Sequence, residues 1–399
     1  MLRSLTLLVA AALAADPAPG RGGEPAGPVA GVRGDFARVV VRDGDRQRSI
    51  EGRIVVEAVD GGLLVELADQ RYRPLQPSEI VSREPLPQPP QEAGRDLGRR
   101  VLAELPAGFD LHVTKHYVLC FGTSREYAKW AAAVFERLHE TFGNYWRRAG
   151  VDLHDTDDAS RPLVVVIFAD RHGYETHAAR DVGSAADRVV GYYNLLTNRV
   201  VTYDLTAADA RPAGGGGGGG RSGRRGLEFL AQPESALLVS TLVHEATHQM
   251  AFNSGMHRRL APVPLWVSEG IATTFEPADL RHQSGWRGLG SINRPRLDRF
   301  RKAYHPGCLE AVVATDDAFR AADTAIDAYA MAWALAWFLM ETRRDDFVGY
   351  LRGIAGREPL TEYPREERLR DFAAAFGGTP AEIEPALVRA MARIELRKP

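Results

Sequence analysis

Two histidines four positions apart constrain this chain more than any other feature. The segment 242–250 reads LVHEATHQM and has the pattern of a helix. His244 and His248 therefore project from one face of that helix and can share one metal ion. Glu245 directly follows the first histidine, so its carboxylate can reach a metal-bound water without binding the metal. The pattern predicts a helix that carries two metal ligands and a general base.

A second segment offers a third ligand. Glu269 lies in PLWVSEGIA (264–272), an otherwise apolar helix start, 21 positions after His248. A buried carboxylate needs a compensating cation. Two imidazoles and one carboxylate with an open fourth position are typical of catalytic rather than structural zinc sites. We therefore expect one Zn²⁺ on His244, His248 and Glu269; the alternative is a partly exposed helix with paired histidines.

With both motifs in place, the chain resembles the gluzincin metallopeptidases, the thermolysin-like clan in which HExxH is followed by a helix with a glutamate ligand. Segment 240–276 looks closest to a group of uncharacterised exported bacterial peptidases, and the similarity extends over about 116–340. The resemblance implies hydrolysis of peptide bonds by a zinc-activated water with Glu245 as general base. It also implies a peptide groove beneath an edge strand, for which 199–204 is the candidate.

Some members of the clan stabilise the oxyanion with a Tyr or His beyond the third ligand. Tyr329, 60 positions after Glu269, is the catalytic candidate by this resemblance. Tyr304 and His305 are alternatives. Tyr329 also recurs at helical spacing with Trp333 and Trp337, a pattern that a core helix would explain equally well.

The chain departs from the clan in two places. It lacks the Gly-x-Met-Glu-Asn segment with which aminopeptidases hold a free amine, so we expect an endopeptidase. Position 273, one turn after the third ligand, is Thr where relatives place a carboxylate that orients a histidine. Two other functions remain open: a catalytically silent zinc-fold protein that binds cell-envelope polymers through its N-terminal domain, and a hydrolase of non-peptide amides or esters.

Composition changes divide the chain into segments. We expect an α+β protein with a small antiparallel, SH3-like β-domain, then a zincin-type domain with a mixed β-sheet lobe and a mainly helical C-terminal lobe. The expected segments are a signal peptide (1–15), a disordered leader (16–30), the β-domain (31–84), a Pro-rich linker (85–95) and the peptidase domain (96–399), with a flexible Gly/Arg-rich insertion at 211–226.

Apolar periodicity orders the elements of the larger domain. A strand at 116–121, a helix at 124–148, a buried strand at 162–169 and a hairpin of 189–193 with 199–203 make a β-α-β-β-β unit. From 233 onward the pattern is almost entirely helical.

Bulk charge and cysteine content restrict the partners. With 50 basic and 52 acidic residues, no overall field favours nucleic acid. No apolar run after the signal peptide is long enough to span a bilayer, so we expect an exported periplasmic or extracellular protein that acts on peptides or proteins. Cys120 and Cys308 predict either one disulfide or buried thiols, and the oligomeric state stays open.

Overall fold

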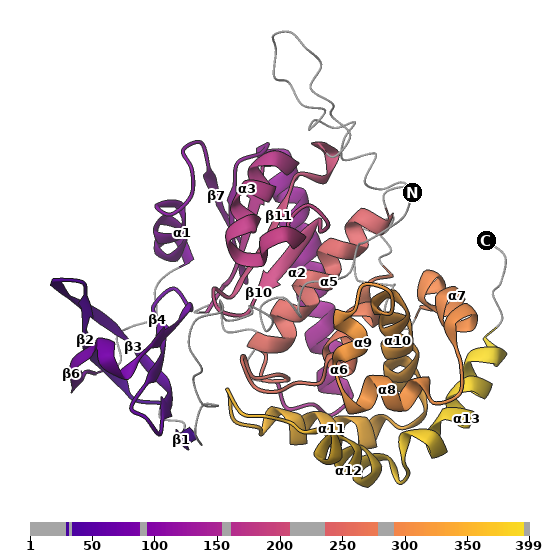
Figure 1. Cartoon of the computed structure of the whole chain (residues 1–399). Helices are drawn as coiled ribbons and strands as arrows, with labels where there is room; N and C mark the ends of the chain where they lie inside the picture. Colours follow the sequence, from indigo (N-terminus) through magenta and orange to yellow (C-terminus); the bar gives the residue numbers. More distant parts are fainter. Residues whose placement is uncertain are drawn as a thin grey trace.

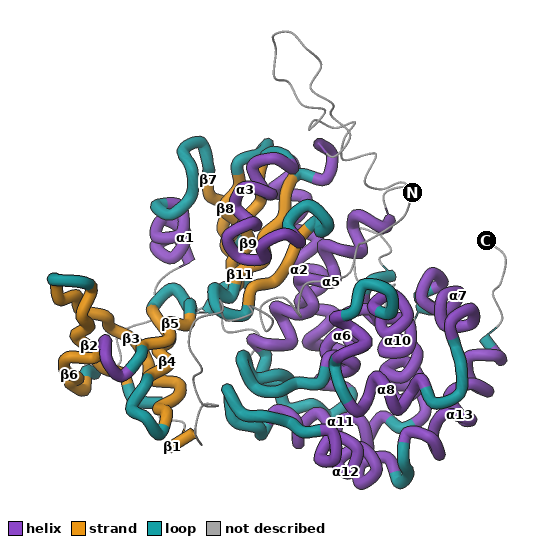
Figure 2. The backbone as a smooth tube through the Cα atoms, in the orientation of Figure 1, coloured by secondary structure: helices purple, strands orange, loops and turns teal. Residues whose placement is uncertain are grey.

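The computed structural model describes residues 29–31, 34–87, 94–153, 161–207, 236–277 and 291–394. A small β-domain in indigo, a mixed sheet with its helices in magenta, and a group of helices in orange and yellow follow one another along the chain (Figure 1). The strands gather in two separate sheets, and helices fill the rest (Figure 2). The expected α+β class is confirmed: an antiparallel sheet, a mixed sheet, then a mainly helical region.

The β-domain is one antiparallel sheet. Its strands follow the order β5-β4-β3-β2-β6, and β1 pairs with β3. Buried and partly buried residues alternate along β2, so one face of the sheet forms the core. Register shifts in β2 and β3 mark bulges that curl the sheet. The elements are β1 (Val29–Gly31), β2 (Phe36–Asp43), β3 (Arg46–Ala58), β4 (Leu63–Leu67), β5 (Tyr72–Leu75), η1 (Pro77–Glu79) and β6 (Ile80–Pro85).

The second sheet is mixed and follows the order β10-β11-β9-β8-β7. Its three central strands are parallel, and both outer strands are antiparallel. Helices α1 and α3 cover one face while α2 and α5 cover the other, which explains why β8 and β9 are buried throughout. The elements are α1 (Gly94–Leu102), β7 (Asp110–Val113), β8 (Tyr117–Phe121), α2 (Arg125–Arg148), β9 (Leu163–Phe168), α3 (Arg171–Val182), η2 (Gly183–Ala185), β10 (Gly191–Asn194), β11 (Arg199–Tyr203), η3 (Leu205–Ala207) and α5 (Ala236–Asn253).

This sheet contains the predicted strands and the predicted helix at 124–148, but it corrects the predicted β-α-β-β-β order and the predicted edge. Strand β7 precedes β8, and helix α3 lies between β9 and the β10–β11 hairpin, so the observed order is β-β-α-β-α-β-β. We expected the strand at 199–204 to be the edge, and that expectation is wrong. Strand β11 pairs with β9 on one side and with its hairpin partner β10 on the other. Because β11 takes the parallel position next to β9, the hairpin leaves β10 as the outer strand.

The helical lobe surrounds one apolar helix. Most residues of α10 are buried, and α6 packs along it. Among the helices that the structure describes, none is both long and apolar enough to span a bilayer. The helices are α6 (Leu265–Phe275), α7 (Arg294–Ala303), α8 (Cys308–Ala314), α9 (Asp317–Arg320), α10 (Ala325–Thr342), α11 (Arg344–Ala355), α12 (Arg365–Phe376) and α13 (Pro380–Arg393).

Several predicted segments fall outside the described residues. These are the signal peptide (1–15), the insertion (211–226), and most of the leader and of the linker. Strand β1 starts two residues before the expected start of the β-domain at 31, and α1 begins one residue before the expected end of the linker at 95. Cys120 and Cys308 are both buried free thiols, so of the two alternatives the structure has the thiols.

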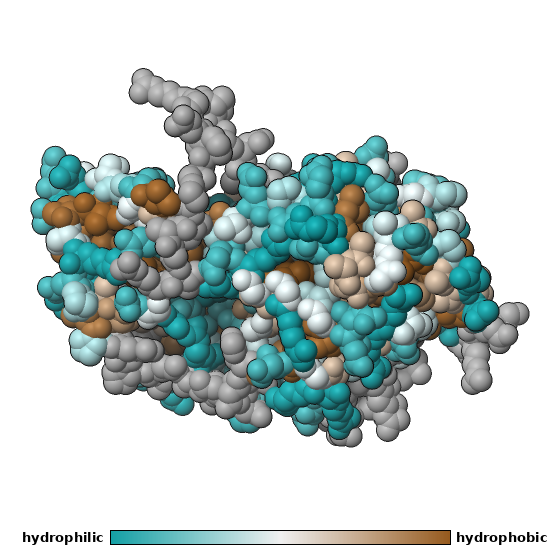
Figure 3. Space-filling view, turned by 90° about the horizontal axis from the view of Figure 1, so that it is seen from below, coloured by the Kyte–Doolittle hydropathy of each residue, from teal (hydrophilic) through white to brown (hydrophobic). Residues whose placement is uncertain are grey.

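Polar contacts join the β-domain to the larger domain. The amide N–H of Tyr72 donates to the carbonyl of Leu196 at 2.7 Å. Gln70 donates through Nε2 to the carbonyl of Pro162 at 3.0 Å and accepts at Oε1 from Asn198 at 2.9 Å. Seen from below, hydrophilic residues surround a hollow between the two parts (Figure 3).

Candidate metal centre

Helix α5 is fixed against the mixed sheet by one buried amide. The Nε2 group of Gln249 donates to the carbonyls of Val164 at 2.9 Å and Asn198 at 3.0 Å. These bonds connect α5 to β9 and to the β10–β11 turn. His244 and His248 lie five positions and one position before Gln249, on another side of the helix, so a helix held at this point presents them towards α6 rather than the sheet.

Helix α6 is fixed at its start and along its length. Asp316 accepts the amide N–H of Leu265 at 3.0 Å and is itself paired with Arg368 at 2.7 Å. Gly270 lets α6 approach α10 closely, because a Cβ atom there would lie 2.7 Å from the carbonyl oxygen of Ala332. Both constraints act beside Glu269 and determine where its carboxylate lies.

The three predicted ligands converge. Oε2 of Glu269 lies 3.0 Å from Nε2 of His244 and 3.4 Å from Nε2 of His248, and the two Nε2 atoms lie 3.0 Å apart. All three residues are buried, and their ligand atoms form a group that could hold one metal ion. Ligands bound tetrahedrally at roughly 2.0–2.1 Å lie about 3.3 Å from one another, close to these separations.

An unsatisfied atom supports the same fit. Oε1 of Glu269 is fully buried and has no hydrogen-bond partner among the described residues. A buried carboxylate oxygen without a partner is costly unless a cation lies beside it. The donor set of two imidazole nitrogens and one carboxylate oxygen suits Zn²⁺. The residues present therefore fit a zinc ion.

Mutual charge perturbs the group strongly. Burial alone would raise the pKa of Glu269, but His248 and His244 outweigh it and lower that pKa to about 2. Burial alone would lower the pKa of His244, but Glu269 and Glu276 raise it to about 10. The carboxylate is thus held as an anion that demands positive charge beside it.

Glu276 is a residue of the centre that the sequence did not reveal. Its Oε1 lies 3.1 Å from Nδ1 of His244, and it accepts from Arg296 at 2.9 Å and from Asn293 at 2.7 Å. Burial would raise the pKa of Glu276, but Arg296 and then His244 lower it to about 2. Thr273 occupies the position at which the resembled clan has a carboxylate, and its hydroxyl donates to the carbonyl of Glu269 at 2.7 Å. The sequence signal that could have indicated Glu276 is its position seven residues, or two helical turns, after Glu269.

Glu245 lies next to the group and faces the edge of the sheet. Its Oε2 accepts the backbone N–H of Tyr193, in the outer strand β10, at 2.8 Å. Burial raises the pKa of Glu245, and the neighbouring histidines partly oppose that rise. Its exposed fraction is 8%. The predicted base therefore lies beside the candidate ligands and beside β10, the outer strand of the sheet among the described residues.

Tyr329 borders the metal centre, whereas the contacts of Tyr304 and His305, the two alternative candidates, lie elsewhere. The ring of Tyr329 lies 6.4 Å from that of His244, and the guanidinium of Arg296 lies 5.5 Å from its centroid. Tyr329 also packs against Phe319, so it belongs to the core of the lobe as well. Tyr304 packs on Phe300, and His305 contacts the carbonyl of Pro306.

Residues 238–361 match a family model described as a protein of unknown function (DUF1570). The match spans both motif segments and continues through α10, so it includes the ligands, Glu245, Glu276 and Tyr329. No curated protein matches the chain. The candidate metal ligands therefore lie in a segment that is similar to this family model, and the similarity assigns no activity to that segment.

Proposed function

We propose that this chain is an exported zinc-dependent metallohydrolase that cleaves peptide bonds. One observation carries the proposal: His244, His248 and Glu269 converge on one point. The buried carboxylate of Glu245 lies beside them and is not one of the three candidate ligands. When bound, zinc supplies a Lewis acid that lowers the pKa of a bound water towards roughly 7 and polarises a carbonyl.

Glu245 is placed to take and return the proton. As general base it accepts a proton from the attacking water, and it then donates that proton to the leaving amine. Its raised pKa brings it closer to neutral pH, where a group that both accepts and donates works best. Tyr329, at the border of the centre, is our candidate for stabilising the oxyanion through its hydroxyl.

The edge strand favours a peptide as substrate. Because the N–H of Tyr193 points away from β11 towards Glu245, it is available to a ligand that displaces this contact. An extended peptide that adds to β10 would accept this N–H with one of its carbonyls. Its scissile bond would then lie near Glu245. A small amide or ester would not need this strand.

The test combines metal analysis with cleavage profiling of the mature chain. We expect one zinc per chain, cleavage within a broad peptide library, and no turnover by the Glu245→Gln variant at unchanged zinc content. A Glu126→Gln variant, altered on the exposed first turn of α2, serves as matched control and should cleave normally. A Glu245→Gln protein that binds zinc and cleaves like the wild type would refute the role of Glu245.

The same assay separates the alternatives. Stoichiometric zinc without cleavage of any peptide would favour the binding protein over the enzyme. Turnover of ester or amide reporters without peptide cleavage would favour a non-peptide hydrolase. Absence of zinc from a folded chain would contradict all three proposed functions, the peptidase, the binding protein and the non-peptide hydrolase.

A further inference from the structure

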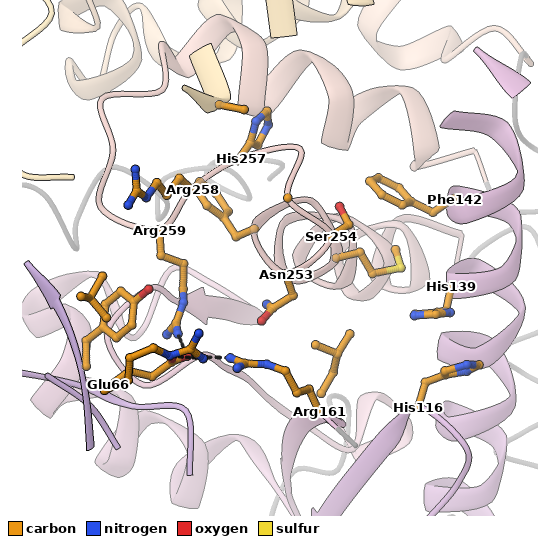
Figure 4. Close-up of a pocket in the computed structure, with 18 of the residues that line it drawn as sticks. Glu66, His116, His139, Phe142, Arg161, Asn253, Ser254, His257, Arg258 and Arg259 are labelled. Atoms are coloured by element: carbon orange, nitrogen blue, oxygen red, sulfur yellow. Dashed lines mark hydrogen bonds and ion pairs between the residues drawn. The ribbon is translucent and has the colours of Figure 1, made fainter. Parts of the chain in front are cut away.

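A second polar cluster lies away from the metal centre. It lines a cavity of about 820 Å³ between the β-domain and the larger domain (Figure 4). The walls come from β3, β4 and β5, from α2, and from the end of α5 with the loop that follows it. None of the three metal ligands lines this cavity. Its volume lies in the range of small-molecule sites, roughly 300–1,000 Å³.

One wall of the cavity carries an excess of positive charge. Glu66 is paired with three arginines: Arg53 at 2.8 Å, Arg161 at 2.7 Å and Arg259 at 3.0 Å. Figure 4 shows Arg259 and Arg161 meeting at Glu66. One carboxylate balances one of these three cations. The cluster therefore keeps two positive charges that a ligand can neutralise.

Two of the three arginines have donors to offer. Arg259 has few donors left for a ligand, because it is nearly buried over the ring of Tyr72 and also donates to the carbonyl of Gln70. Arg53 and Arg161 are more than one-third exposed, and each contacts Glu66 through one terminal nitrogen. A guanidinium binds a carboxylate or phosphate through two parallel N–H groups. Arg53 and Arg161 can thus hold an oxyanion at the cavity wall.

A buried acceptor lines the same cavity. His257 is 1% exposed, and its Nδ1 lies 3.0 Å from the carbonyl of Met256. Its Nε2 has no hydrogen-bond partner among the described residues. Burial lowers the pKa of His257 to about 3, so the ring is neutral and, with Nδ1 donating, Nε2 is an acceptor. A hydroxyl group of a ligand can donate to this acceptor.

We propose that this cavity binds a small hydroxylated organic anion, with its phosphate or carboxylate on Arg53 and Arg161 and a hydroxyl donating to Nε2 of His257. The apolar side chains of Phe142 and Met250 also line the cavity, where they can pack against the carbon skeleton. The site lies at the junction of the two domains, so its occupant contacts both. It is independent of the metal centre and of the reaction proposed there.

Calorimetric titration of the full-length protein tests the site with three probes: inorganic phosphate, glucose 6-phosphate and gluconate. We expect saturable binding of one molecule per chain, tighter for a hydroxylated probe than for inorganic phosphate. Loss of one charged hydrogen-bond donor should weaken binding about tenfold, so we expect that loss from Arg53→Gln and from Arg161→Gln. The comparison of glucose 6-phosphate with gluconate shows whether the oxyanion is a phosphate or a carboxylate.

Three further variants sharpen the test. Arg48→Gln changes an exposed arginine of β3 away from the cavity and should leave binding unchanged. His257→Leu should weaken the hydroxylated probe but not inorganic phosphate. Glu66→Gln removes the competing carboxylate and should strengthen binding, a change opposite in sign to that of the arginine variants. Thermal melting verifies that each variant is folded.

Two results would overturn the proposal. One is the absence of saturable binding by all three probes at millimolar concentration. The other is a folded Arg53→Gln, Arg161→Gln double variant that binds as tightly as the wild type.

Discussion

Oε1 of Glu276 lies 3.1 Å from Nδ1 of His244, while Nε2 of the same ring lies 3.0 Å from Glu269. A carboxylate on Nδ1 favours the tautomer with the proton on that nitrogen, which leaves the Nε2 lone pair for a metal. Arg296 and Asn293 hold Glu276 in turn. The imidazole is therefore oriented by a chain of buried contacts from α7.

Replacing Glu276 with Gln should weaken zinc binding without removing a ligand. The amide keeps an acceptor oxygen but loses the charge that makes His244 a stronger base, and changes of this kind typically cost about 10–100-fold in metal affinity. Competition with a chelator measures the effect. Glu341→Gln, at an exposed position in the last turn of α10, should bind zinc as the wild type does. Equal affinities for both variants would show that Glu276 does not position the ligand.

The substitution Tyr329→Phe distinguishes two candidate roles of Tyr329, oxyanion stabilisation and core packing. If the hydroxyl stabilises the oxyanion, Tyr329→Phe should lower kcat by about 100-fold with little change in KM or zinc content, because the ring still fills the core. Tyr304→Phe, on the α7–α8 connection, should leave kcat unchanged. Steady-state kinetics on one peptide substrate decides. A Tyr329→Phe enzyme with normal kcat would leave this residue with a packing role alone.

The candidate metal ligands could be predicted because their geometry is mostly local. The four-residue spacing of His244 and His248 places them on one helix face whatever surrounds it. An acidic residue in an apolar helix start marked Glu269. Glu276 escaped prediction because its partner lies 32 positions away and the helix alone does not tell which carboxylate faces the histidine.

Long-range pairing explains the other differences. Which strand is the sheet edge depends on whether β11 or β10 pairs with β9, and a hairpin pattern is the same in both cases. The cavity between the domains is equally invisible in sequence, since Glu66 meets Arg161 and Arg259 across 95 and 193 positions. In the sequence alone, single charged residues such as these are typical of a solvent-exposed surface.

Gly270 tests how closely α6 must approach α10. A Cβ atom there would lie 2.7 Å from both the carbonyl of Ala332 and the Cβ of Ala336, so Gly270→Ala should destabilise the fold by about 1–3 kcal/mol. Gly349 in α11 has no atom within 4 Å of such a Cβ, and Gly349→Ala should stabilise by about 0.5–1 kcal/mol. Denaturant unfolding of both variants measures the free energies. Destabilisation of similar size in both would contradict the close contact.

The pH dependence of stability tests the charge cluster around Glu66. Burial would raise the pKa of Glu66, but Arg161, Arg259 and Arg53 outweigh it, so the folded pKa lies below the ordinary 4.5. A carboxyl whose pKa is lowered on folding contributes stability in full above its unfolded pKa and loses it as the pH falls through the folded value.

Thermal unfolding of the wild type and Glu66→Gln between pH 3 and pH 7 should therefore show a wild-type advantage at neutral pH that shrinks below about pH 4.5. The control Glu51→Gln changes an exposed glutamate of β3 whose partner Arg38 is also exposed, and it should show little pH-dependent difference. A wild-type advantage that persisted or grew at pH 3 would mean that the three arginines do not stabilise the ionised carboxylate. Because the cluster bridges the two domains, its loss in acid should first loosen the β-domain from the larger domain.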